Sequence, residues 1–202
     1  MTGQSGLLLA MMQPPPTMEE EFQDWYDTEH FPERAGCEGF VTAHRLICLD
    51  GFPRYLALYD LSSRAVLDGP GYAAVARNRY SQWTKRIIPR MWGHYRAEAD
   101  QIFPGSARFG DEGSPARLAL WRFSGVPEGS EQAIVNGVRA SFADTPGVLQ
   151  IRVFQARAAE TGDFIATIEL AGPLVLPAPK ADILGQTVRH LTLSNVYMPY
   201  WR

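Results

Sequence analysis

A glutamate and a histidine stand next to each other near the end of a predicted amphipathic helix. In a helix over residues 18–30, rotation of about 100° per residue places Phe22, Trp25 and Glu29 on one face. His30 follows at the edge of that face. Burial raises the pKa of a carboxyl group, and an imidazole changes charge close to neutral pH, so both groups suit proton transfer. Glu29 and His30 are therefore the candidate catalytic residues, for acid–base chemistry on a small molecule.

Aromatic and basic side chains elsewhere in the first half of the chain could complete a substrate site. Two aromatic residues flank the acid–base pair on the helix and could hold a flat substrate. His44 and Tyr55 fall on neighbouring predicted strands and could face one cavity, while Arg86 could bind a carboxylate. The candidate substrate-binding residues are Trp25, Tyr26, His44, Tyr55, Trp83 and Arg86.

Each of these residues also has a purely structural interpretation. Glu29 could pair with an arginine such as Arg34 or Arg45, because an unpaired buried carboxylate is costly. His30 could cap the last carbonyl groups of its helix. Aromatic residues at helical spacing belong to a core more often than to a ligand site. The sequence leaves the catalytic and the structural interpretations open.

The elements predicted around these residues follow the order β-α-β-β-α-β. Three consecutive prolines stop the first strand, and Thr17 resembles a helix N-cap that Glu20 would complete as a capping box. Pro32 predicts that this helix ends at residue 31. The predicted elements are strands at 7–13, 40–49, 55–61 and 87–97 and helices at 18–30, 63–76 and 81–86. This order is that of a ferredoxin-like unit.

The same pattern repeats in the second half of the chain. Residues 103–115 are rich in glycine, serine, proline and charge and are predicted to be a linker between a first half at 1–102 and a second, degenerate half at 116–202. Strands are expected at 116–123, 148–156, 164–170 and 188–197, with helices at 129–142 and 181–185. Residues 39–45 line up with residues 147–153, each after the first helix of its half.

The aligned strands indicate how the two halves meet. Each has one apolar face and one mixed face, which carries Thr42 and His44 in the first half and Gln150 and Arg152 in the second. Helices of the same half would cover the apolar face, so the mixed face must meet the other sheet. The predicted fold is therefore α+β, with two tandem ferredoxin-like units that form a two-sheet barrel within one chain.

Composition and missing motifs exclude several classes of function. The 202 residues carry a net charge of −3, which gives no electrostatic reason to bind nucleic acid or an anionic membrane. Two cysteines make no disulfide framework, so a reducing, cytoplasmic location is expected. The apolar run at residues 6–12 is too short for a membrane span. Zinc-binding, P-loop and dinucleotide-binding motifs do not occur, and neither a metal nor a cofactor is expected.

Three stretches of the first half resemble the dimeric α+β barrel superfamily. They are Asp-Trp-Tyr-Asp-Thr-Glu-His-Phe-Pro-Glu-Arg at 24–34, Gly-Phe at 39–40 and Tyr-Leu-Ala-Leu-Tyr at 55–59, and they are most similar to EthD-like and related uncharacterised proteins. The resemblance implies two sheets that meet as a barrel, usually across a dimer, and a pocket between sheet and helices. It assigns His30 to the histidine of the motif. Residues 68–90 contain no histidine, which argues against the haem site of some superfamily members.

The expected function is a cofactor-independent lyase, isomerase or cyclase acting on an aromatic or polyketide-like small molecule. His30 would move the proton, and Glu29 would orient it or share the transfer. A small-molecule binding protein without turnover, a cofactor-free monooxygenase and a scaffold are the alternatives. The second half has no counterpart of the Glu-His-Phe-Pro motif, so one active pocket is expected. An exposed strand edge or helix face could still pair two chains as a homodimer.

Overall fold

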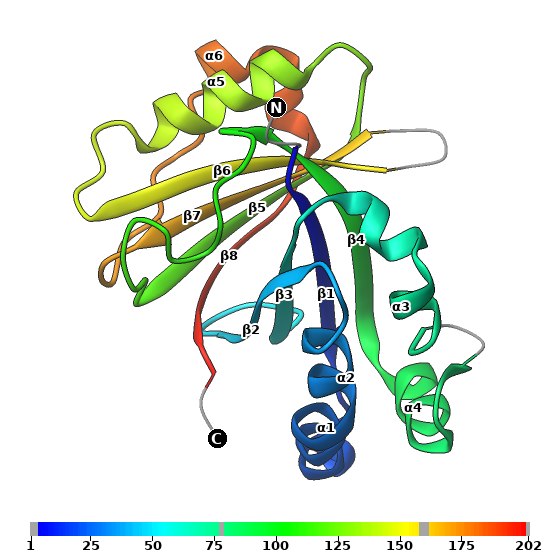
Figure 1. The fold of residues 1–202 in the computed structure, drawn as a ribbon. Helices are drawn as coiled ribbons and strands as arrows, with labels where there is room; N and C mark the ends of the chain where they lie inside the picture. Colours follow the sequence, from blue (N-terminus) through cyan, green and yellow to red (C-terminus); the bar gives the residue numbers. More distant parts are fainter. Residues whose placement is uncertain (1–3, 77–78, 158–161, 201–202) are drawn as a thin grey trace.

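The chain folds into a closed antiparallel β-barrel with helices packed on its outside (Figure 1). The computed structural model describes residues 4–76, 79–157 and 162–200. Around the barrel the strands follow the order β1-β3-β2-β8-β5-β7-β6-β4. The strands are β1 (Gly6–Gln13), β2 (Phe40–Cys48), β3 (Tyr55–Leu61), β4 (Trp92–Phe103), β5 (Arg117–Val126), β6 (Val148–Ala156), β7 (Gly162–Leu170) and β8 (Leu191–Pro199).

Each half contributes four consecutive strands with the same internal order. The first half reads β4-β1-β3-β2 and the second β8-β5-β7-β6, so each is a ferredoxin-like sheet. The halves join where β4 pairs with β6 and where β2 pairs with β8. The expected fold, two tandem ferredoxin-like units closing one barrel, is confirmed.

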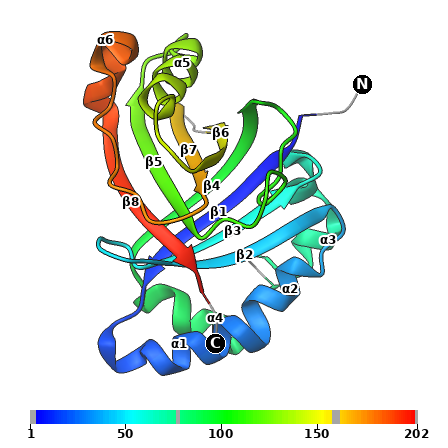
Figure 2. The same ribbon diagram turned by 90° about the vertical axis from the view of Figure 1, so that its left-hand side faces the viewer.

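Helices cover the outside of each half separately (Figures 1 and 2). The helices are α1 (Glu19–Trp25), α2 (Phe31–Ala35), α3 (Pro70–Ala73) and α4 (Gln82–Ile87) on the first half, and α5 (Glu131–Phe142) and α6 (Ala181–Leu184) on the second. Strand alternation therefore gives three cores, one inside the barrel and one under each helix layer. Within the described part of the chain, no helix is long and apolar enough to cross a membrane.

The barrel interior is mostly apolar, with polar side chains such as Gln150 and Thr167 beside one buried group of charges. The Arg152 guanidinium lies 2.6 Å from a carboxylate oxygen of Asp60 and 3.2 Å from one of Glu169, and all three side chains are at most 2% exposed. The backbone N–H groups of Phe109 and Gly110 donate to Asp60 and Glu169 at 2.7 and 2.9 Å. These bonds hold the segment between β4 and β5 against the barrel. Because Arg152 is buried inside the barrel, the mixed face of its strand points inward.

The first helix does not end at Phe31, as Pro32 had suggested. A π-helical turn at Tyr26–His30 follows α1, and α2 continues through Pro32 to Ala35. In this turn the Phe31 N–H donates to the Tyr26 carbonyl, five residues earlier. The wider turn removes the clash that a proline ring makes with the preceding turn of an α-helix. The prediction was wrong because it allowed only α-helical geometry.

Two strand boundaries also differ from the predicted ones. β4 begins at Trp92, because the preceding residues continue α4 and a 3-10 turn at Ile88–Arg90. Ile87 is fully buried on the helix and not on a strand. β8 begins at Leu191, after another 3-10 turn at Gly185–His190. The capping box expected at Thr17 does not form, since a 3-10 turn at Pro16–Met18 leads directly into α1.

Candidate functional site

His30 lies under the helix layer of the first half, at the end of the π-helical turn. Its side chain is only 6% exposed. The ring stands 4.1 Å from the Trp25 ring and 5.3 Å from the Tyr26 ring, centroid to centroid. Its backbone carbonyl accepts a hydrogen bond from Arg34 Nη1 at 2.9 Å. The π-helical turn, which lets the helix run on past Pro32, thus sets where this imidazole points.

A small polar cavity opens beside the His30 ring, between the sheet and the helices. The cavity has a volume of about 60 Å³. Its walls are formed by Leu8, Ala10, Met12, Tyr26, His30, Arg34, Tyr59, Tyr72, Tyr80, Ile88, His94 and Arg96. His30 Nδ1 is buried and has no hydrogen-bond partner in the described structure. A buried nitrogen without a partner is unusual in a folded protein and suits a group that meets a ligand.

The surroundings of His30 keep its imidazole neutral. Burial holds the pKa of His30 well below its usual value, and the charges of Arg34 and His94 lower it further. Burial also raises the pKa values of Tyr26 and Tyr59, whose hydroxyl groups therefore stay protonated. At neutral pH the cavity thus holds an uncharged base beside hydroxyl donors.

Two arginines line the cavity, and both also pair with glutamates, Arg34 with Glu33 at 3.5 Å. Arg34 is 4% exposed and donates to backbone carbonyls, those of His30 and of Val75 at 3.2 Å. Arg96 on β4 pairs with Glu98 and donates to the Tyr72 hydroxyl at 3.0 Å. A guanidinium bound to carbonyl dipoles keeps its charge, so the cavity favours an anion that forms inside it.

Glu29, the second predicted catalytic residue, points away from this cavity. Its carboxylate accepts hydrogen bonds from Ser81 Oγ at 2.5 Å and from Thr84 Oγ1 at 3.0 Å. Thr84 Oγ1 in turn accepts from Trp25 Nε1 at 2.9 Å. Ser81 caps the N-terminus of α4 through the Thr84 N–H. Glu29 therefore joins the first helix to α4, and it lies beside His30 in sequence only.

Three predicted substrate-binding residues also lie outside the His30 cavity. The Tyr55 hydroxyl donates to Glu19 on α1. Arg86 forms an exposed ion pair with Glu21. Trp83 is half-buried and packs against the first-half helix core. Of the predicted binding residues, Tyr26 lines the cavity and Trp25 supports the His30 ring from behind.

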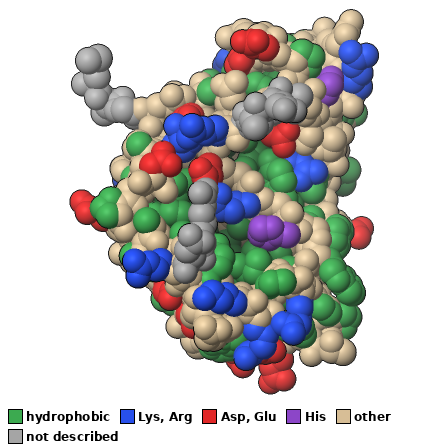
Figure 3. All heavy atoms as spheres, turned by 90° about the vertical axis from the view of Figure 1, so that its right-hand side faces the viewer, with side chains coloured by type: hydrophobic (Ala, Val, Ile, Leu, Met, Phe, Trp, Pro, Cys, Tyr) green, Lys and Arg blue, Asp and Glu red, His purple; other side chains and the backbone are tan. Residues whose placement is uncertain are grey.

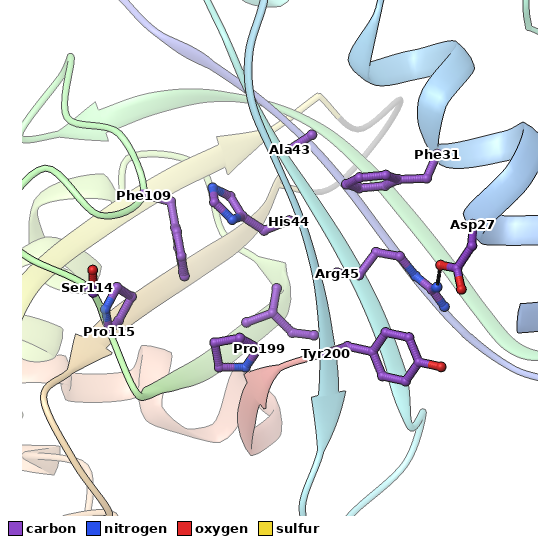
Figure 4. Close-up of a pocket in the computed structure, with 11 residues that line it drawn as sticks. Asp27, Phe31, Ala43, His44, Arg45, Phe109, Ser114, Pro115, Pro199 and Tyr200 are labelled. Carbon is purple, nitrogen blue, oxygen red and sulfur yellow. Dashed lines mark hydrogen bonds and ion pairs between the residues drawn. The ribbon is translucent and has the colours of Figure 1, made fainter. Parts of the chain in front are cut away.

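His44, the remaining candidate, lines a separate and larger cavity (Figure 4). This cavity has a volume of about 480 Å³ and lies at the edge of β2. Its walls are formed by Asp27, Phe31, Ala43, His44, Arg45, Leu46, Phe109, Ser114, Pro115, Pro199 and Tyr200. We call it the seam pocket, because it adjoins the short β2–β8 junction. The structure therefore does not bring His30 and His44 into one site.

Several cavity residues were missed by the sequence analysis. Tyr59 lies four residues after Tyr55 in the same predicted strand. Because side chains alternate between the two faces of a strand, the sequence could have placed both tyrosines on one face. Arg34 belongs to the motif at residues 24–34 but was weighed only as a partner of Glu29. Tyr72 and Arg96 come from α3 and β4, and their contact depends on tertiary packing that no local pattern reports.

The face that carries α3, α4 and β4 is the side on which the His30 cavity nears the surface. Histidine and basic side chains reach the surface there among hydrophobic ones (Figure 3). His94, which lines the cavity, is exposed. Among the described residues, no three histidine, cysteine or acidic side chains come close enough together to hold a metal ion.

Comparison with known proteins shows the fold but no family. No protein-family model and no curated sequence matches the chain. A solved anthrone oxidase-like protein is 13% identical, with a TM-score of 0.68 over 98% of this chain and 92% of that one. A candidate monooxygenase from Fusobacterium nucleatum is 12% identical, with a TM-score of 0.52 over 98% and 93% of the two chains. A chlorite dismutase variant from Candidatus Nitrospira defluvii is 9% identical, with a TM-score of 0.56 over 98% and 92%.

These likenesses place the chain in the dimeric α+β barrel fold, with its two units fused. At sequence identities this low, the role of a residue in one protein cannot be transferred to a residue of the other. The arrangement around His30 must therefore be judged on its own chemistry.

Proposed function

We propose that this chain is a cofactor-independent oxygenase for a small phenolic or enolisable molecule, with His30 as the base. The observation that carries the proposal is the buried His30 imidazole, which lines the cavity and whose Nδ1 has no hydrogen-bond partner among the described residues. A neutral imidazole with a depressed pKa can accept a proton at neutral pH. The fold shared with an anthrone oxidase-like protein supports oxygenation over the lyase, isomerase or cyclase reaction expected from the sequence.

The proposed reaction needs only a base, an anion-stabilising site and dioxygen. His30 removes a proton from an acidic CH₂ group of the substrate, or from the hydroxyl group of a phenol, which leaves an enolate or a phenolate. The ring carbon of a phenol that reacts is the CH₂ carbon of its keto tautomer. The enolate oxygen is stabilised by Arg34 and by a tyrosine hydroxyl in the cavity. The electron-rich carbon then forms a bond to dioxygen, and the product takes up a proton as a hydroperoxide. Loss of water from this hydroperoxide leaves a ketone, so each CH₂ group consumes one O₂ and releases one H₂O.

The volume of the cavity limits which substrates can react. A cavity of about 60 Å³ has room for about two water molecules. It therefore admits the reacting end of a molecule and not a whole polycyclic ring system. The proposed substrates are monocyclic phenols or cyclic diketones whose remaining atoms lie toward Tyr80 and exposed His94.

Oxygen consumption is the direct test. Purified protein would be mixed with 1,3-cyclohexanedione, simple phenols and anthrone in an oxygen electrode, and the products identified by mass spectrometry. We expect uptake with a monocyclic compound, and slower uptake with anthrone. His30→Ala should abolish it, whereas His190→Ala, in the second half, should not. His190 is a matched control because it lies far from the cavity and its Nε2, like His30 Nδ1, is buried without a partner among the described residues, while its Nδ1 lies 3.0 Å from the Ser124 carbonyl.

Other outcomes would select a different function. If a compound is converted without oxygen uptake, and the conversion requires His30, the protein is a lyase or isomerase that uses the same base. A compound that binds and is recovered unchanged would mean a binding protein. Equal oxygen uptake by wild type and His30→Ala would refute the role of His30.

A further inference from the structure

The seam pocket lies where the barrel wall is incomplete. β2 pairs with β8 only through Leu46–Cys48, so the preceding residues of β2 have no strand beside them on this side. Tyr200 bonds to the Arg45 carbonyl through its N–H at 2.9 Å and closes one end. The segment between β4 and β5 lies on the other side, with Phe109 facing His44 (Figure 4). A cavity of about 480 Å³ remains between them, within the usual range for small-molecule sites.

Three aromatic side chains from separate elements form part of the walls of the seam pocket. Phe31 comes from α2, Phe109 from the segment before β5, and Tyr200 from the end of the chain. The His44 ring lies 4.1 Å from the Phe109 ring, centroid to centroid. Rings that converge from separate elements bind planar aromatic molecules well, since each can offer a face or an edge to the ligand.

The charges in the seam pocket are already balanced. The Arg45 guanidinium pairs with Asp27 and donates to Gln23 at 2.6 Å. It also stacks on two tyrosine rings, 4.5 Å from the centroid of Tyr26 and 4.4 Å from that of Tyr200. Burial lowers the pKa of His44, which leaves its imidazole neutral at neutral pH. Among the described residues of the pocket, no charged side chain lacks an opposite partner, so a neutral ligand fits it better than a charged one.

One polar atom in the pocket lacks a partner. His44 Nε2 is buried and makes no hydrogen bond to any described residue. A neutral imidazole offers one donor nitrogen and one acceptor nitrogen, so Nε2 can bond to a hydroxyl or to a carbonyl group. A ligand with such a group would remove the cost of leaving this nitrogen unpaired.

We propose that the seam pocket binds a neutral, planar aromatic molecule with a hydroxyl or keto group, which Phe31, Phe109 and Tyr200 enclose and His44 Nε2 hydrogen-bonds. This site shares no wall residue with the His30 cavity. The two sites touch through Arg45, which stacks on Tyr26, and through Phe31, whose ring lies 5.6 Å from the Tyr59 ring, centroid to centroid. The proposal therefore stands apart from the proposed oxygenase reaction and from its base.

A pair of matched ligands tests the proposal. The affinities of 2-naphthol, naphthalene and 2-naphthoate for the purified chain would be measured by calorimetry and competition. We expect 2-naphthol to bind about three- to tenfold more tightly than naphthalene, as one additional hydrogen bond would give. His44→Leu should remove this difference while naphthalene binds as before. The 2-naphthoate anion should bind more weakly than 2-naphthol.

The variants also locate the ligand. His30→Ala should leave the affinity for 2-naphthol unchanged, and Phe31→Ala should lower the affinity for all three ligands. Thermal melts would confirm that each variant is folded. The proposal is overturned if none of the ligands binds, or if His30→Ala abolishes binding while His44→Leu does not. Tighter binding of 2-naphthoate would show that the ligand class is wrong. Oxygen uptake with the monocyclic substrates, measured separately on His44→Leu, should persist, so failure of either proposal can be told from failure of the other.

Discussion

The two helix layers of this protein share a topology and differ in what they bury. Under the first-half helices lie His30, Arg34 and four tyrosines around a cavity. Under the second-half helices the core is apolar, with Trp121, Phe142 and aliphatic side chains in close contact. α5 and α6 pack so closely that a Cβ atom on Gly137 would lie 2.3 Å from Leu184 Cγ.

The difference shows which helix layer carries polar groups at a cost in folding free energy. Polar groups placed under a helix layer cost free energy unless each has a partner. The second half fills its layer with apolar side chains, and the buried Trp121 Nε1 there has no partner among the described residues. In the first half, His30 Nδ1 is unpaired in the same way, but its ring lines a cavity. We infer that the second-half layer serves the fold and the first-half layer serves chemistry. The predictions below test this contrast, from the largest expected effect to the smallest.

Trp121→Ala should have the largest effect on stability. The side chain is fully buried and packs 4.9 Å from the Phe142 ring, centroid to centroid. Emptying this site should lower the free energy of unfolding by about 3–5 kcal/mol. Urea denaturation would measure the loss, and oxygen uptake per folded molecule should stay within a factor of about two. A specific loss of turnover in folded Trp121→Ala would contradict a purely structural second layer.

His30→Gln should give the opposite result. Glutamine is close to histidine in volume but cannot act as a base, so turnover should fall by about 100-fold or more. The free energy of unfolding should change by less than about 1.5 kcal/mol, because no hydrogen bond of the imidazole is lost. Initial rates and urea denaturation on the same preparation separate the two effects. A large loss of stability with unchanged turnover would make His30 a structural residue.

Gly137→Ala should cost a moderate amount. The added methyl group would push against Leu184, and overpacking of this kind costs about 1–3 kcal/mol. Alanine regains about 1 kcal/mol through its better helix propensity. The net loss should therefore be about 1 kcal/mol by denaturation. Asn136→Ala, at an exposed position on the same helix, is the control and should be close to neutral.

The pH dependence of stability should show an effect as small as that of Gly137→Ala. Because the folded-state pKa of His30 lies below its unfolded value, the unfolded chain binds the proton first as pH falls. Stability should therefore fall below about pH 6.5, by up to about 1.4 kcal/mol per pH unit from this group. His30→Gln should flatten the curve between pH 7 and pH 5.5. Identical slopes in the two proteins would mean that His30 is not held neutral in the fold.

The sequence predicted the barrel because its signals are local or periodic. The alternating faces at Thr42 and His44, and again at Gln150 and Arg152, identified which strand faces meet inside. It failed at Pro32, where a π-helical turn replaces the α-helical geometry assumed. It also failed at Glu29, because the position of α4 decides which way that carboxylate turns.

The candidate site was only partly predictable. His30 could be identified from its motif, since the motif lies on one helix. The cavity around it needs Tyr72 and Arg96 as well, and these come from distant elements whose contact is fixed by packing. The separation of His30 from His44 likewise depends on which face of β2 each approaches, which the sequence alone did not resolve.

The buried ion group shows what covalent fusion of the two units permits. The repeat aligns His44 with Arg152, and pairing on the neighbouring strands makes Asp60 the counterpart of Glu169. In a barrel of two identical chains, an arginine at this position would appear once in each chain. Any substitution of that arginine would also appear in both chains. Joining the units into one chain breaks this twofold symmetry. One arginine, Arg152, can then pair with both carboxylates. The equivalent position in the first half can carry a different residue, His44, which lines the seam pocket.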